Sequence, residues 1–411
     1  GGPTRDEIVC GRYVPQPHGS TFRRYGVLFK SLHATGYRMG ISETYARGRR
    51  LLGANPGNVV LAAIVVVLLL DLGRQLLVGE QMFFRLGVLV KDGLMRGLVI
   101  GLAGIGLSMT YSILNFANFA HGDYITAGGF AGWATTYVVA GLSVAAGNRP
   151  DIGSLLLVGA GGSVFGGALG IGIASTPLAV IAGLVVAGGF TIALSLFVDR
   201  YAFKPLRDRS GIALLITSIG VAFAIRFLIQ FVFGPSRRGL TSTQPSVGIP
   251  FVDGTVQLRA HDITLAVVAV ALMLGVHLLL QRTKLGKAMR AMADNEDLAR
   301  VTGIPTEQVV RYTWIIGGGL TGVAGYMFFL WKGTMGYFDG WLLLLLIFAA
   351  VILGGIGSIY GAIIGGLIIG VTASVSVVWI PSDFARAAAF MVMIVILLVK
   401  PQGIFAGRST A

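Results

Sequence analysis

Four polar residues in a short apolar stretch are the side chains of this sequence best suited to chemistry inside a membrane. Asn115, Asn118, His121 and Asp123 fall within residues 111–124, between runs of apolar residues. An unpaired polar group in hydrocarbon is costly, so each needs a protein partner or a water-filled cavity. The pattern predicts either a helix break that lines a path for a polar solute, or structural roles in which Asp123 or Asn118 caps a helix and His121 bonds a carbonyl.

No catalytic or metal-binding motif accompanies these residues. His121 has no second histidine or carboxylate cluster beside it, which argues against a metal site. The sequence lacks the phosphate-binding Gly-x-x-x-x-Gly-Lys-Ser/Thr loop, the Gly-x-Ser-x-Gly elbow and the His-Glu-x-x-His zinc helix. We therefore expect a protein that is not an enzyme, hydrolyses no ATP itself and needs no cofactor.

A polar segment, Gln281 to Arg311, separates two long apolar runs and is predicted to be structured. Leu285, Met292 and Ala299 recur at seven-residue spacing, with Ala288 and Met289 beside them, which indicates one apolar helical face. A second face carries Lys287, Arg290, Asp294 and Asp297.

The ends of these helices are also suggested by the sequence. Asp294 is predicted to cap a helix that Gly303 ends and Pro305 stops, and Thr306 to cap the next helix. Such an amphipathic helix between membrane spans is suited to docking a partner. The alternative is a solvated basic loop that only sets membrane topology.

Composition places the chain among membrane proteins. Of its 411 residues 55% are hydrophobic and only 12% are charged, about half the charged fraction of a soluble domain. Apolar runs near twenty residues long recur from Asn58 onward, which predicts an all-α, polytopic membrane protein with about 9–10 transmembrane helices. The net charge of +14 is concentrated in loops and the N-terminal segment, so membrane orientation explains it better than nucleic-acid binding. The single cysteine, Cys10, excludes an internal disulfide.

The pattern of runs and loops predicts four regions. They are a basic, disordered N-terminal extension (1–57), an extra span with a linker (58–92), a multi-span domain (93–400) with a glycine-rich insertion at 146–177, and a C-terminal tail (401–411). The alternating pattern of Thr255 to Arg259 predicts a short strand. When the basic segments 1–57, 199–210 and 282–311 are placed in the cytoplasm and residues 146–177 stay outside, the predicted spans alternate consistently and the C-terminus is also cytoplasmic.

Within the spans, small residues and isolated charges suggest packing roles. Gly354, Gly355, Gly357 and Gly361 are predicted to let two helices pack tightly, as is the Gly97-xxx-Gly101 spacing. Arg226 is interpreted as a buried structural partner or an interfacial anchor rather than a proton relay. Few acidic residues lie deep in the spans, and Asp71 is the plain case, which argues against proton-coupled transport.

Five segments in order carry a family resemblance. They read SILNFANFAHGD, YAFKPL, LITSIG, GKAMRAMADNE followed by Gly303-Ile304, and VILGGIGSIYGA, at residues 112–123, 201–206, 215–220, 286–296 and 351–362. Together they resemble the permease subunits of branched-chain amino acid ABC transporters, over roughly residues 93–400.

The resemblance implies partners and a contact segment. It implies that the chain is a multi-pass protein of the cell membrane, in contact with membrane lipid. Its implied protein partners are a second permease subunit, two ATP-binding subunits and an extracytoplasmic binding protein. It places a coupling helix in the polar segment, with Arg290, Ala291, Asp294, Asn295, Glu296 and Gly303 as contacts. The N-terminal extension and the insertion depart from the family pattern.

The sequence leaves two other functions open. A permease of the same architecture could carry urea or short amides, because specificity in such systems rests largely with the binding protein. A self-sufficient channel or secondary transporter would instead move solute without any ATPase.

Overall fold

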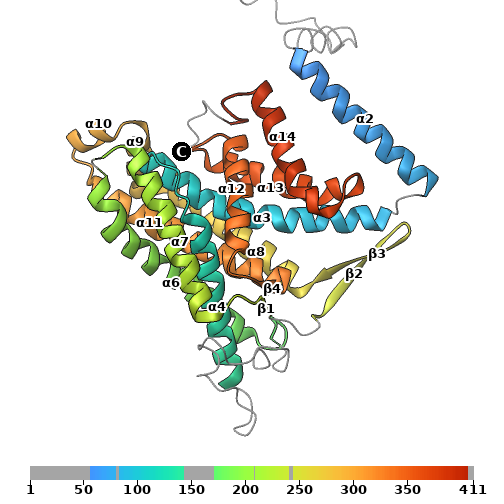
Figure 1. Ribbon diagram of the computed structural model, residues 1–411, viewed down its shortest axis with the longest axis horizontal. Coiled ribbons are helices and arrows are strands. Elements are labelled where there is room, and N and C mark those ends of the chain that lie inside the picture. The colour runs from blue at the N-terminus through green and yellow to red at the C-terminus, as the bar shows by residue number, and fades with distance from the viewer. Residues whose placement is uncertain (1–55, 80–82, 143–170, 208, 240–243, 406–411) are drawn as a thin grey trace, which may run out of the picture. The chain divides into compact units, whose positions relative to one another are not determined.

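The computed structural model describes residues 56–79, 83–142, 171–207, 209–239 and 244–405. Within these residues the chain is predominantly helical (Figure 1), which confirms the all-α, polytopic prediction. The predicted N-terminal extension, most of the glycine-rich insertion and most of the C-terminal tail lie outside the described residues.

Long apolar helices dominate the described chain. In order they are α2 (Pro56–Val78), α3 (Phe83–Leu114), α4 (His121–Leu142), α6 (Pro177–Val198), α7 (Gly211–Phe233), α8 (Ala260–Arg282), α11 (Thr306–Lys332), α12 (Asp339–Gly354), α13 (Ile359–Val375) and α14 (Ala385–Val399). Two short helices, α9 (Lys284–Asp294) and α10 (Glu296–Val301), lie between α8 and α11, and single turns of π- or 3-10 helix cover Asp199–Phe203, Lys204–Leu206, Ser376–Val378 and Ser382–Phe384.

Two small antiparallel sheets complete the described fold. Strand β1 (Arg238–Gly239) pairs with β4 (Thr334–Met335), and β2 (Ser246–Phe251) forms a hairpin with β3 (Gly254–Arg259). In the hairpin, Ser246 lies opposite Arg259 and Phe251 opposite Gly254. The strand predicted for residues 255–259 is thereby confirmed.

Each predicted span corresponds to one of the long helices. In the described part of the chain, seven helices are long and apolar enough to cross a membrane: α3, α6, α7, α8, α11, α13 and α14. The other three predicted spans are α2, α4 and the shorter α12, whose 16 residues reach about 24 Å at 1.5 Å per residue. Such a length falls short of the roughly 30 Å hydrocarbon core.

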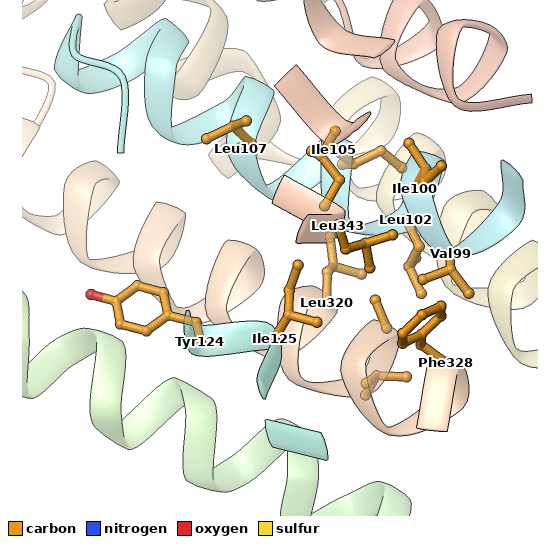
Figure 2. Close-up of a cluster of buried hydrophobic side chains, with 14 of the residues drawn as sticks. Val99, Ile100, Leu102, Ile105, Leu107, Tyr124, Ile125, Leu320, Phe328 and Leu343 are labelled. Atoms are coloured by element: carbon orange, nitrogen blue, oxygen red, sulfur yellow. The ribbon is translucent and has the colours of Figure 1, made fainter. Parts of the chain in front are cut away.

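Burial separates central helices from peripheral ones. The apolar stretches of α3 and α11 are 78% and 83% buried, whereas that of α14 is only 11% buried. Figure 2 shows the contact region, where Val99 and Leu102 of α3 meet Leu320 and Phe328 of α11. Apolar side chains exposed on peripheral helices suit contact with lipid tails.

Glycines allow α3 and α13 to touch along their backbones. A Cβ atom built on Gly366 of α13 would lie 2.6 Å from the backbone nitrogen of Gly101, and one built on Gly97 would lie 2.8 Å from the Cα of Leu367. No side chain fits such gaps, so the small-residue spacing on α3 sets the close approach of these helices.

The turn between α12 and α13 uses the predicted glycines in two ways. A Cβ on Gly354 or Gly361 would overlap the backbone of the other residue, so both allow close contact. Gly355 and Gly357 adopt φ values of +103° and +87°, which side chains disfavour. The amides of Ile404 and Phe405 donate to the Leu353 and Gly354 carbonyls at 2.9 and 3.0 Å, so the chain end packs on this turn.

The polar residues of helix α2 interact around one side chain, that of Asp71. The Asp71 carboxylate accepts hydrogen bonds from Trp379 Nε1 at 2.9 Å and from Gln75 at 2.7 Å, and it pairs with Arg74 at 3.2 Å. Because Asp71 and Arg74 pair with each other and Asp71 also accepts from Trp379 and Gln75, the rest of α2 can keep an apolar surface.

Candidate functional site

The polar segment after α8 folds into two consecutive helices. The Thr283 hydroxyl accepts from the Gly286 amide at 3.0 Å and begins α9. A Cβ on Gly286 would lie 2.5 Å from the Cα of Leu280, so glycine permits the sharp turn out of α8. Asp294 was predicted as the next cap, but Asn295 takes this role and accepts from the Leu298 amide at 2.9 Å. Asp294 instead ends α9, because that helix runs one residue longer than the sequence pattern suggested.

The end of α10 fits the sequence more closely. Gly303 has a φ of +86°, and the Gly303 and Ile304 amides donate to the Arg300 and Ala299 carbonyls at 3.1 and 3.0 Å. This is a Schellman arrangement, which requires a residue such as glycine in the left-handed region. The prediction that Thr306 caps α11 was wrong, since Pro305 occupies that position and Thr306 is the first helical residue.

The two faces of the segment differ in burial. Met289, Met292 and Ala299 are buried on the side packed against α8, α11 and α3. Of the predicted contact residues, Asp294, Asn295, Glu296 and Gly303 are exposed, and Arg290 and Ala291 are half-buried. The predicted contacts therefore lie on one accessible surface, and Arg290 contributes only part of its side chain.

Two exposed apolar side chains on α10 escaped the sequence analysis. Leu298 is 61% exposed and Val301 84% exposed, among charged residues that include an Arg300–Glu296 ion pair of 2.9 Å. Their three-residue spacing is the signal that could have revealed them, because it places both on one face of a helix. We call Asp294, Asn295, Glu296, Leu298, Val301 and Gly303 the α9–α10 surface.

A charged network ties this surface to the basic loop after α6. Glu307, in the first turn of α11, pairs with Lys204 at 2.8 Å and with Arg207 at 3.1 Å. Arg207 also binds Asp199 through two hydrogen bonds, one of 2.6 Å. Residues 199–207 and the α9–α10 surface therefore lie at the same end of α11. Arg207 and Asp199 are largely buried, which makes this junction firmer than an exposed ion pair.

The predicted helix break lies between α3 and α4. Asn115 ends α3 in the left-handed region, with a φ of +53°, and its side chain is exposed. Residues 115–120 are not helical, and α4 begins at His121. His121 contacts Ala103 in the middle of α3, so the chain between the helices runs back into the bundle. Non-helical backbone at such a depth is tolerated where it is buried in protein or lines a cavity.

His121 and Asn118 are buried at this break. His121 Nε2 lies 2.9 Å from the Ala103 carbonyl oxygen, and because a carbonyl only accepts, Nε2 carries the proton. Asn118 Oδ1 accepts from the Ala120 amide at 3.1 Å, whereas its Nδ2 has no partner among the described residues. The geometry of His121 fits the structural interpretation, and the unpaired Asn118 donor fits a polar path.

Asp123 forms a buried ion pair with Arg226 of α7. Nε and Nη2 of Arg226 donate to the two carboxylate oxygens at 3.0 and 2.8 Å, and both side chains are at most 4% exposed. Rings of Phe223, Phe338 and Trp341 surround the guanidinium at 4.5–5.2 Å. The pair joins the first turn of α4 to α7 and the start of α12, next to the helix break.

Across the described residues, no group of three histidine, cysteine or carboxylate side chains is arranged to hold a metal ion.

Arg96 is a further basic residue, which was not predicted from the sequence. It lies in the buried helix α3, within an apolar run, and is partly buried. A charge inside a membrane helix is itself a functional signal.

A bundle of apolar helices with a broken helix at its centre and a structured polar segment at one end is the architecture of a multi-pass membrane permease. Residues 89–399 match the family described as "Branched-chain amino acid transport system / permease component". Because the match covers most of the sequence, the chain belongs to this family. It is a transport protein rather than an enzyme.

Named relatives agree with this assignment. The high-affinity branched-chain amino acid transport system permease protein LivH of Salmonella typhimurium is 28% identical over 324 residues, 76% of this chain and 93% of its own length. Protein BraD of Pseudomonas aeruginosa, which has the same description, is 27% identical over 316 residues, 76% of this chain and 93% of its own. A probable branched-chain amino acid transport permease of Methanocaldococcus jannaschii is 27% identical over 348 residues, 83% of this chain and 95% of its own.

Proposed function

We propose that this chain is the permease subunit of an ATP-driven importer of branched-chain amino acids, and that the α9–α10 surface docks on separate ATP-binding subunits. The family membership supports the transport role. The exposed Leu298 and Val301, held in a short capped helix among charged residues, support the docking role. Apolar anchors ringed by polar groups are typical of protein interfaces.

The proposal includes an orientation and partners. The end of the bundle that carries the α9–α10 surface and the basic residues Lys204 and Arg207 faces the cytoplasm, as the positive-inside rule favours. The chain end packed on the α12–α13 turn is cytoplasmic too. A second permease subunit completes the pathway in the cell membrane, two ATP-binding subunits supply energy, and an extracytoplasmic binding protein delivers the amino acid at the opposite end.

The mechanism follows from the rigidity of the docked segment. The buried methionines of α9 pack on α8 and α11, and the Glu307 network ties α11 to the end of α6. Movement of an ATP-binding subunit against α10 would therefore pass to α8, α11 and α6 together. The helix break beside α3 is the place where such a movement could open a polar path.

Replacement of one exposed anchor tests the docking role. In the full transporter, Leu298→Asp should lower co-purification of the ATP-binding subunits about tenfold or more, because an interface anchor contributes at least about 1.4 kcal/mol. The side chain is 61% exposed, so the permease should still fold. Uptake driven by ATP should fall in parallel.

The matched control is Val252→Asp in the β2–β3 turn, where the side chain is 86% exposed. This variant should retain the ATP-binding subunits. If Leu298→Asp keeps both co-purification and ATP-driven uptake at the original level, the docking proposal is wrong.

A further inference from the structure

A cavity of 440 Å³ lies among α3, α11, α12 and α14, and no residue of the α9–α10 surface or of the helix break lines it. Lys332 and Asp339, which line it, stand at the end of α11 and the start of α12, whereas the α9–α10 surface precedes α11. The 27 residues of α11 therefore separate the two sites by about 40 Å. The volume lies within the range of small-molecule sites, about 300–1,000 Å³.

Four cationic and two acidic side chains line this cavity: Arg96, Arg259, Lys332, Arg386, Asp339 and Asp383. Some of them are already balanced. Asp339 accepts from Arg237 at 3.1 Å, from Lys332 at 3.2 Å and from the Gly336 amide at 3.0 Å. Arg259 pairs with Asp262 at 3.4 Å.

Arg96, Arg386 and Asp383 form no hydrogen bond or ion pair with any described residue. Arg96 is half-buried, whereas Arg386 and Asp383 are exposed. Asp92 attracts Arg96, and Arg386 repels it to a smaller extent. Two guanidinium groups that face one cavity without a hydrogen-bonded partner can bind an anionic group between them, because charge-assisted hydrogen bonds to a carboxylate or phosphate are among the strongest in proteins.

Trp331 provides an independent observation. The residue is 8% exposed and lines the cavity, and its Nε1 is buried with no hydrogen-bond acceptor among the described residues. An unpaired buried donor is costly, and a bound acceptor would recover that cost.

Apart from Ser382, the remaining lining is apolar. Phe328, Leu342, Leu343 and Leu346 form a wall beside the charged groups. Unpaired cations, one unpaired carboxylate and an aliphatic wall together match the three parts of an aliphatic α-amino acid.

We propose that this cavity binds a zwitterionic aliphatic amino acid. Its carboxylate lies with Arg96 and Arg386, its ammonium group with Asp383, and its side chain against Phe328 and the leucines. The assignment rests on the proposed import function, for which the cavity is the entry site at the end opposite the ATP-binding subunits. An anionic group could also come from a lipid phosphate, and this source is separated by the experiment.

Equilibrium binding of radiolabelled L-leucine to the full chain tests the proposal. The protein is placed in nanodiscs of phosphatidylcholine and, separately, of phosphatidylglycerol. We expect saturable binding in both lipids, about tenfold or more weaker in Arg96→Met and restored substantially in Arg96→Lys. Arg85→Met, an exposed position on the same helix outside the cavity, should bind as the original chain does.

Competition between leucine and its analogues tests whether the carboxylate and the ammonium group of the ligand are both recognised. Leucinol, which lacks the carboxylate, and isocaproate, which lacks the ammonium group, should each compete about tenfold or more weakly than leucine. Equal binding by Arg96→Met, or equal competition by both analogues, would overturn the proposal. Of the two lipids, only phosphatidylglycerol has a net anionic headgroup, so leucine binding that disappears in that lipid would assign the cavity to an anionic lipid headgroup and overturn the proposal too.

This test is independent of the docking role because no ATP-binding subunit is present. If the coupling proposal fails, Leu298→Asp retains its partners while leucine binding is unchanged. If the cavity proposal fails, leucine binding is insensitive to Arg96 while Leu298→Asp still loses its partners.

Discussion

At the residue scale, the Asp123–Arg226 pair is the strongest electrostatic feature of the helix break. The two side chains form two hydrogen bonds, are almost completely buried and connect α4 to α7. Removing one partner leaves an uncompensated charge in an apolar environment, which costs about 3–5 kcal/mol in buried pairs. The pair therefore holds the break in one arrangement.

Single and double substitutions measure this contribution. We expect Asp123→Leu and Arg226→Met each to lower the free energy of unfolding by about 3–5 kcal/mol, and the double variant to be more stable than either single one. Thermal unfolding of the purified chain in detergent provides the comparison. Additive losses in the double variant would show that the two residues act separately.

How far the residues could be predicted from sequence depended on local chemistry. The polar group at 115–123 and the structural role of Arg226 stood out because charges are rare in apolar runs. The partner of each could not be predicted, since Asp123 and Arg226 lie 103 residues apart and only the packing of α4 on α7 brings them together. Arg96 was overlooked for a similar reason, because its significance comes from the cavity around it.

At the element scale, the described helices follow the apolar pattern, whereas their ends depend on single side chains. The Asn295 cap and the Gly303 turn fix the two ends of α10. The cap lies one residue later in the structure than the Asp294 cap that the sequence predicted. The approach of α3 to α13 depends instead on glycines that leave no space for a side chain.

A pair of glycine substitutions tests that packing. Gly366→Ala should lower the free energy of unfolding by about 1–3 kcal/mol, because a methyl group would meet the backbone of Gly101 at 2.6 Å. Gly275→Ala in α8 has nothing within 4 Å and should leave stability unchanged or raise it by up to about 1 kcal/mol. Thermal unfolding midpoints of the two variants decide the question, and equal midpoints would contradict the account of close packing.

At the scale of the whole molecule, the two proposed sites lie at opposite ends of α11. The α9–α10 surface carries exposed apolar side chains, which we propose contact a partner, and charged side chains line the cavity by Arg96, which we propose binds a solute. The broken helix lies between them, where α3, α4 and α11 meet at His121 and Thr321. In the proposed importer, energy enters at one end of these helices and substrate at the other.

Site-directed photocrosslinking tests the central claim most directly. In a Cys10→Ser background, which removes the one cysteine of this sequence, Leu298→Cys and Val252→Cys are each labelled with a benzophenone maleimide before the ATP-binding subunits are added and the transporter is assembled. In the chain without its partners both positions are well exposed, at 61% and 86%, so labelling should be comparable. We predict that illumination joins an ATP-binding subunit to position 298 and not to position 252. Capture of that subunit at position 252, or its absence at position 298, would contradict the account.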